Sequence, residues 1–189
     1  MNPEISYYVF AIIAVILAGL AKGGFAGVGA LAMPVMALGV DPVRGAAILL
    51  PILILQDAVS VWVYRRSWDG AILKVMLPGA AIGILLAHAG SPPFQMWVLP
   101  KRLPRDMLVG TTALAFAAMT WMKMPAYAAL GQFTRANLMA TAMLVPVAVV
   151  STLAGVALVR RVDPARFYTL IYGLMVLLGI KLVADALMA

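Results

Sequence analysis

Long apolar runs interrupted by glycine and proline limit what this chain can fold into. The first run, Tyr7–Leu20, ends in Ala21–Gly29, where four glycines and Lys22 stand before a second run, Ala30–Leu38. A glycine costs a helix about 1 kcal/mol against alanine, and a charge at the centre of a membrane helix costs roughly 2.5–3.5 kcal/mol. Irregular backbone at membrane depth is tolerated where it lines a protein-walled or wet cavity. The pattern therefore predicts a deliberately broken membrane helix.

A second break, His88–Gln95, echoes the first. Lys22 and His88 are separated by 66 residues, and Leu73 and Leu138 by 65. Paired Gly/Pro-interrupted segments at matching places in two halves point to a binding site at the repeat interface. We therefore divide the chain into two related halves, residues 1–87 and 88–189. By this symmetry the chain lacks one helix and one half-helix near residues 85–88, which indicates an internal deletion.

Composition places the chain in the membrane. Of its 189 residues, 65 % are apolar and 11 % charged, and its mean hydropathy is +1.03, whereas soluble domains are about 45–50 % apolar. We expect an all-α integral membrane protein, a polytopic helical bundle with a broken or re-entrant helix in each half. The net charge of +7 lies mostly in short loops, so lipid headgroups explain it better than nucleic acid does. With no cysteine and one histidine, neither a metal nor a cofactor is expected.

The apolar pattern predicts where the helices begin and end. Asp41 and Pro42 are expected to cap and start the second helix. A loop carrying Pro125 is expected after the helix that crosses in the second half. The predicted spans are 5–38 with its break, 43–64, 71–87, 107–122, 136–159 and 167–187, with a half-helix over 93–99 and a loop over 123–132.

The basic residues do not fix the orientation. If both broken elements cross the membrane, seven Lys/Arg fall on one side and five on the other, which is too even for the positive-inside rule. If the breaks instead fold back as re-entrant hairpins, the number of complete crossings changes, and with it the side of the membrane on which each loop lies. The two groups are Arg44, Lys101, Arg102, Arg105, Arg160, Arg161 and Arg166, against Arg65, Arg66, Lys74, Lys123 and Arg135.

Five stretches, in this order, resemble the TauE/SafE family of sulfite and organosulfonate exporters, also called the 4-toluene sulfonate uptake permease family. The resemblance implies a multi-pass carrier of the bacterial inner membrane that moves small sulfur-containing anions. It also implies a central segment that this chain lacks, in agreement with the repeat. The stretches are Ala21–Gly27, Leu50–Asp57, Tyr64–Asp69, His88–Gln95 and Leu130–Thr134.

Lys22 is the first candidate for substrate binding. Its ammonium group in a glycine-rich break, beside free backbone N–H groups and the start of a half-helix near Val28, suits an oxyanion. The alternative is a lysine that snorkels to the interface. Gly23, Gly24 and Gly27 are expected to let backbone approach a ligand, or else to pack helices together, since Gly23 and Gly27 have GxxxG spacing.

The second break supplies the other candidates. His88 binds an anion as imidazolium or relays protons, or it is a buried histidine bonded to a carbonyl. Gly90, Ser91 and Gln95 are assigned to the same substrate site as backbone and hydrogen-bonding groups. Gln56 and Asp57, in the middle of a predicted helix, serve either coupling, with Asp57 paired to Lys22, or a structural hydrogen bond between helices.

No nucleophile–base pair, carboxylate dyad or nucleotide-binding loop occurs in the sequence, so we do not expect an enzyme. The expected function is secondary transport, with export of sulfite or organosulfonates favoured over import. Two alternatives stay open. In the first, the shortened chain is a transport-deficient remnant, or it completes its fold only as a homodimer that exchanges elements. In the second, the protein is a passive anion channel. The expected partners are the anion and the lipid bilayer, without nucleic acid.

Overall fold

The computed structural model describes residues 3–25, 27–87 and 97–163, together with residues 166, 167, 169–173, 176, 180 and 183. Every regular element in this part of the chain is helical. Four helices are long and apolar enough to cross a bilayer: Ser6–Gly23, Pro42–Val63, Arg105–Ala129 and Arg135–Arg161. The expectation of an all-α, polytopic membrane protein is thereby confirmed at this level.

The first predicted element is interrupted where the glycines stand. Helix α1 (Pro3–Gly23) is followed by the 3-10 helix η1 (Val28–Leu31) and by the short helix α2 (Ala32–Ala37). The chain then folds back along α1, since a Cβ placed on Gly39, beyond α2, would lie 3.2 Å from the Cα of Tyr7 near the start of α1. The α1 and α2 elements therefore form a helical hairpin whose tip is the break.

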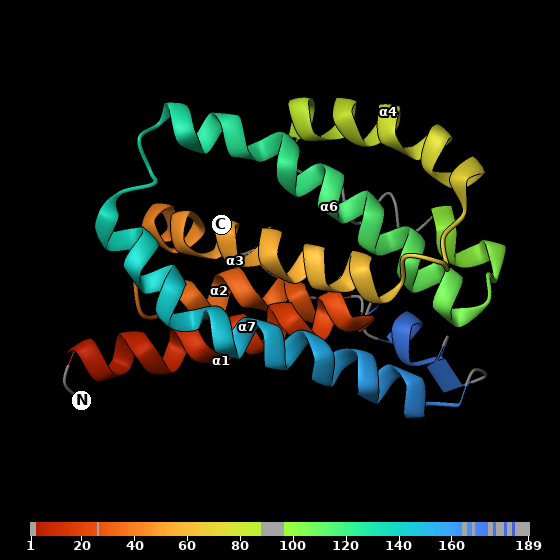
Figure 1. The fold of residues 1–189 in the computed structure, drawn as a ribbon, viewed down its shortest axis with the longest axis horizontal. Helices are drawn as coiled ribbons and strands as arrows, with labels where there is room; N and C mark the ends of the chain where they lie inside the picture. Colours follow the sequence, from red (N-terminus) through yellow and green to blue (C-terminus); the bar gives the residue numbers. More distant parts are fainter. Residues whose placement is uncertain are drawn as a thin grey trace. The chain divides into compact units, whose positions relative to one another are not determined.

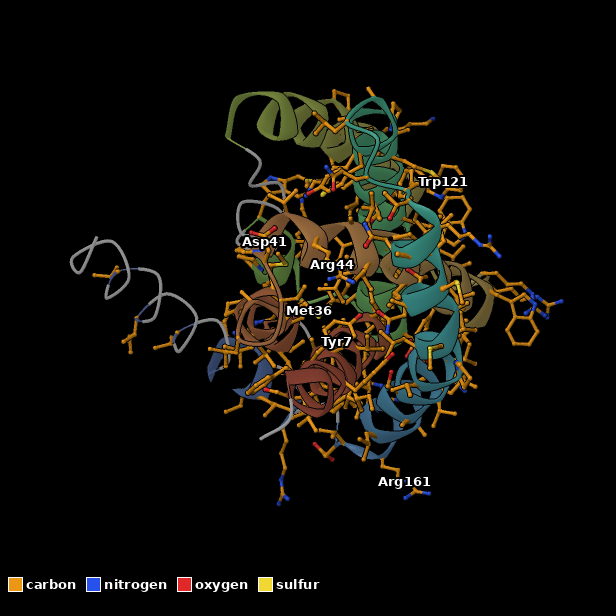
Figure 2. All side chains as sticks on the ribbon, turned by 90° about the vertical axis from the view of Figure 1, so that its left-hand side faces the viewer. Tyr7, Met36, Asp41, Arg44, Trp121 and Arg161 are labelled. Atoms are coloured by element: carbon orange, nitrogen blue, oxygen red, sulfur yellow. The ribbon has the colours of Figure 1, made fainter. Side chains whose placement is uncertain are left out.

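Helix α3 (Pro42–Val63) starts as the sequence predicts. The Asp41 carboxylate accepts hydrogen bonds from the backbone N–H groups of Val43 and Arg44, at 3.0 and 3.2 Å, which is the geometry of an N-cap. The Arg44 guanidinium stands 5.9 Å from the ring centroid of Tyr7, within cation–π range. Figure 2 shows Tyr7, Met36, Asp41 and Arg44 close to one another. This cluster fastens the start of α3 to the base of the hairpin.

Helix α6 (Arg105–Ala129) is longer than predicted. The sequence predicts a helix over 107–122 and a loop over 123–132, but α6 continues through Pro125 to Ala129. Proline interrupts one backbone hydrogen bond, and membrane helices tolerate this because neighbouring groups satisfy the freed carbonyl. The exposed ring of Trp121 projects outward one turn before Pro125 (Figure 2). The predicted loop was therefore wrong over most of its length.

The other predicted helices agree closely with the structure. Helix α4 spans Gly70–Ala87, and α7 spans Arg135–Arg161 with Pro146 inside it; both are labelled in Figure 1. The short 3-10 helix η2, Leu99–Lys101, lies where the sequence analysis predicts the half-helix over 93–99 to end. The described residues of the predicted last span, 167–187, are helical. Most of the predicted half-helix 93–99 lies outside the described residues.

The chain divides into two compact units, each of which we describe by itself. Unit 1 comprises residues 1–46 and 144–189, and unit 2 comprises residues 47–143. These units are defined by packing rather than by the sequence repeat. The division into halves 1–87 and 88–189 stays a prediction.

In unit 1, α1 and the second part of α7 pack against each other through small residues. A Cβ placed on Gly23 would lie 2.6 Å from the Cα of Gly155, and the Ser151 hydroxyl is 3.4 Å from the carbonyl oxygen of Val15. Residue numbers rise together along both helices at this contact, so the helices run parallel. Small residues at i and i+4 allow membrane helices to approach this closely.

In unit 2, α3 and α6 run antiparallel. Asp57, six residues before the end of α3, meets Thr120, whereas Tyr64, directly after α3, meets Gly110 near the start of α6. Thr141, in the first part of α7, lies beside the start of α3, where its hydroxyl is 3.2 Å from the Ile48 carbonyl oxygen. Helix α4 packs along α6 (Figure 1). This packing brings the α3–α4 loop onto the first turns of α6.

Candidate functional site

The first break presents Lys22 at the end of a helix. Lys22 is half-buried in the last turn of α1. The neighbouring Gly23 is buried against the backbone of α7, next to Gly155 and Val156. Gly155 stands six residues before the end of α7, which corresponds to about 9 Å along its axis. Lys22 therefore lies level with the C-terminal third of α7 rather than with its middle.

Several backbone N–H groups of the break already donate hydrogen bonds to nearby backbone carbonyls. Gly24 N–H donates to the Ala21 carbonyl and Phe25 N–H to the Leu20 carbonyl, both at 3.1 Å. This pair of bonds is a Schellman motif that closes α1. Gly24 has φ of 134° at the position after the helix end, where a side chain would be strained. Gly24 therefore has a structural reason to be glycine.

Backbone N–H groups at the start of η1 also donate to carbonyls of the break. Val28 N–H donates to the Phe25 carbonyl at 3.3 Å, and Ala30 N–H to the Gly27 carbonyl at 3.1 Å. Because η1 has only four residues and α2 only six, the aligned peptide dipoles are fewer than those of a full helix. The positive field expected near Val28 is correspondingly weaker than the sequence suggested, and the anion-binding role of Gly23, Gly24 and Gly27 stays a prediction.

Two glycines with GxxxG spacing do hold helices close together, but this pair lies four residues earlier in the chain than the predicted pair. Gly27 lies outside the helix with φ of 100°, so Gly23 and Gly27 do not share a helical face. The close helix contact instead involves Gly19 and Gly23 on α1, which face Ser151 and Gly155 on α7. For Gly23 the packing interpretation therefore has direct support.

The second break lies outside the described residues. This applies to His88, Gly90, Ser91 and Gln95 alike. Their assignment to a substrate site, and the juxtaposition of His88 with Lys22, stay predictions.

Gln56 and Asp57 lie fully buried in the second half of α3, seven and six residues before its end, with exposed fractions of 0 and 1 %. The Thr120 hydroxyl of α6 donates to the Asp57 carboxylate at 2.8 Å, and its oxygen stands equally close to the Phe116 carbonyl. A hydroxyl has one proton, so it donates to one of these acceptors at a time. Asp57 thus links two membrane helices, which matches the structural alternative of the prediction. Its pairing with Lys22 stays a prediction.

Sequence reasoning missed a series of buried hydroxyl groups along α6 and α7. Thr141 bonds to the carbonyls of Ile48 and Asn137, and Thr152 bonds to that of Ala148. The available signal was threonine and serine within otherwise apolar spans, because such side chains hydrogen-bond within and across membrane helices. Among the described residues, the buried serines and threonines are Thr111 and Thr120 on α6, Thr141, Ser151 and Thr152 on α7, and Ser60 on α3.

Among the residues that the structure describes, no group of three His, Cys, Asp or Glu side chains could hold a metal ion. The buried polar groups supply hydrogen bonds between helices, and one buried carboxylate, Asp57, lies among them.

Comparison with known proteins identifies the family. No curated protein and no solved structure matches the chain. The family model described as sulfite exporter TauE/SafE matches residues 87–182, just over half of the chain. The match includes the second-half stretches His88–Gln95 and Leu130–Thr134, and the apolar helices described above fit a membrane transporter. The chain belongs to the TauE/SafE sulfite exporter family.

Proposed function

We propose that this chain is a secondary carrier of the bacterial inner membrane that exports small sulfur-containing anions such as sulfite or organosulfonates. The observation that carries the proposal is the family membership combined with a helix broken beside a basic side chain. The match to a family of sulfite exporters gives the transport class. The break after Gly23 gives a place where a solute could meet a positive charge inside the span.

Lys22 is the residue that we propose to hold the anion. It stands at the tip of the α1–α2 hairpin, where α1 ends and η1 has not yet begun. The hairpin is a re-entrant element in this proposal, since α2 is too short to cross a bilayer and the chain returns along α1. An ammonium group at membrane depth is costly unless it serves a function or reaches the interface.

The packing of unit 2 supports two inverted halves. Shifting α3 by the sequence interval of 65 places it within α6, and these two helices run antiparallel. Repeats that are inverted across the membrane require this relationship between equivalent helices. In the proposed carrier the second break, with His88, Gly90, Ser91 and Gln95, would complete the anion site from the other half. In this proposal, Asp57 and Gln56 would either couple transport to proton movement or stabilise the contact between helices.

Anion flux in proteoliposomes tests the proposal. We expect saturable sulfite or sulfoacetate flux with counterflow, and an apparent affinity at least tenfold weaker in Lys22→Ala, as a lost charge-assisted contact of about 1.4 kcal/mol or more would give. Lys22→Arg should retain most of the affinity because it keeps the charge. Lys74→Ala, which removes an exposed lysine near the start of α4, is the matched control.

The other outcomes separate the alternatives. Unchanged anion affinity in Lys22→Ala would remove the site. Flux that neither saturates nor shows counterflow would indicate a passive channel. No flux in the wild type, beside an active full-length family member, would indicate a transport-deficient remnant, and the size of the particle in detergent would show whether a homodimer forms.

A further inference from the structure

Two basic, tryptophan-containing segments lie at the same end of α6 in unit 2. The first is the α3–α4 loop, and the second leads into α6. The Ser67 carbonyl of the loop packs directly on Gly110, and the Asp69 N–H donates to the Thr111 hydroxyl at 2.9 Å. Helix α6 begins at Arg105, about 8 Å along its axis from Gly110. We call the exposed side chains of these segments the basic cluster: Trp62, Arg65, Arg66, Trp68, Trp97, Lys101 and Arg102.

Within the basic cluster, cations and aromatic rings are arranged together. The Lys101 ammonium stands 4.0 Å from the ring centroid of Trp97, and the Arg65 guanidinium 5.2 Å from that of Trp62. Arg65 also donates to the Trp62 carbonyl, while the Trp68 indole N–H donates to the Arg65 carbonyl, both at 3.0 Å. The rings nevertheless remain exposed, Trp62 to 65 %. Tryptophan in this position is typical of the membrane–water interface.

The acidic side chains nearby are already engaged. The Asp69 carboxylate accepts bonds from the N–H groups of Ala71 and Ile72 and thus caps α4. The Asp106 carboxylate pairs with Arg105 at 3.3 Å. Among the residues that the structure describes, Arg65, Arg66, Lys101 and Arg102 form no ion pair. The cluster therefore presents four positive charges without a protein counterion from that part of the chain.

This contact also changes the count of charges on the two membrane faces. Arg65 and Lys101 lie at the same end of unit 2. The sequence analysis placed them on opposite sides of the membrane if both broken elements cross it. Within unit 2, α6 runs away from this end, so the end of α6 and the start of α7 lie at the opposite end. The end of unit 2 with the basic cluster then carries Arg65, Arg66, Lys74, Lys101, Arg102 and Arg105, and the opposite end carries Lys123 and Arg135. Such an imbalance satisfies the positive-inside rule.

We propose that the basic cluster lies at the cytoplasmic face and binds the phosphate groups of anionic phospholipids in that leaflet. Unpaired cations attract the negative cytoplasmic surface. The exposed rings beside them indicate a lipid rather than a soluble anion, because they need an apolar neighbour that a free phosphate does not provide. The lipid headgroup would contact loops from both segments and hold them on α6.

Thermal unfolding of the purified protein in detergent, titrated with phosphatidylglycerol or phosphatidylcholine, tests this binding. Phosphatidylglycerol should raise the midpoint of wild-type unfolding, and phosphatidylcholine should not. In Arg65→Gln/Arg66→Gln the apparent affinity for phosphatidylglycerol should fall roughly tenfold, since each basic residue contributes to attraction by an anionic surface. Lys123→Gln/Arg135→Gln removes the same charge from the opposite end of unit 2 and should respond as the wild type does.

A second double variant and a fluorescence measurement test the proposal even if the first variant fails to fold. Lys101→Gln/Arg102→Gln should weaken the same titration, and brominated phosphatidylglycerol should quench wild-type tryptophan fluorescence more than brominated phosphatidylcholine. Equal responses of cluster and control pairs would overturn the proposal, as would no preference for phosphatidylglycerol in the wild type. An equal response to inorganic phosphate would indicate a soluble-anion site and would also overturn it.

Discussion

Gly23 and Gly155 lie backbone against backbone, so that a Cβ on Gly23 would stand 2.6 Å from both the Cα and the carbonyl carbon of Gly155. Neither atom belongs to a flexible side chain that could turn aside. The contact holds α1 against α7 in unit 1 at the level where α1 ends. The tip that carries Lys22 is therefore fixed in place by the residue next to it.

The change Gly23→Ala should destabilise the protein. Because the added methyl group meets backbone, the helices must move apart, at a cost of about 1–3 kcal/mol. Gly79→Ala in α4 is the control, since a Cβ there meets nothing within 4 Å and alanine favours the helix. Thermal unfolding in detergent should show a lower midpoint for Gly23→Ala alone. Equal midpoints for the two variants would contradict the close contact.

Loss of the Thr120 hydroxyl should weaken the link between α3 and α6. In Thr120→Val the buried Asp57 carboxylate loses a donor at 2.8 Å, which costs about 1.5–3 kcal/mol for a bond to a charged group. Thr120→Ser should recover most of that stability. Thr112→Val removes a hydroxyl that donates to the Leu108 carbonyl on its own helix and should cost less. Denaturant unfolding of the three variants in mixed micelles measures the difference, and a Thr112→Val cost equal to that of Thr120→Val would argue against the link.

A side chain at position 110 should loosen the α3–α4 loop. In Gly110→Ala the added methyl group collides with the Ser67 carbonyl, and Tyr64 stands 3.1 Å away. We expect limited trypsin digestion to cleave after Arg65 and Arg66 several times faster than in the wild type, because local opening governs such cleavage. Cleavage after Arg161, in unit 1, serves as the internal reference. An unchanged ratio of the two cleavage rates would mean that the loop does not depend on this contact.

The orientation can be read from cysteine labelling, since the natural chain has no cysteine. Arg135→Cys should react with a membrane-impermeant maleimide on intact cells, because α7 starts at the less basic face. Arg161→Cys, at the exposed end of the same helix (Figure 2), should react only after the membrane is opened. The reverse pattern would place the basic face outside.

Several features of the fold could be predicted from local sequence because local chemistry determines them. The helix start at Asp41 and Pro42 and the interruption between Gly23 and Val28 both appear where the residues indicate. Proline misled the prediction at Pro125, because in a membrane helix one lost hydrogen bond does not end the element. Spacing misled it at Gly27, because a helical period has meaning only inside a helix.

What the sequence could not show is how distant segments meet. The return of the chain along α1 depends on Gly39 packing on Tyr7, and the shared face of Arg65 and Lys101 depends on Ser67 packing on Gly110. Neither contact leaves a pattern in the residues next to it. The same holds for Thr120, whose role follows from Asp57 on another helix.

The parallel contact between α1 and α7 also bears on how the chain is made. During synthesis α1 leaves the ribosome before α7, whose contact surface at Ser151 and Gly155 follows more than one hundred residues later. Through that interval the glycine face of α1 is without its α7 partner. Helix α1 therefore reaches this neighbour only after α7 has been made, and its insertion into the membrane precedes the assembly of this contact.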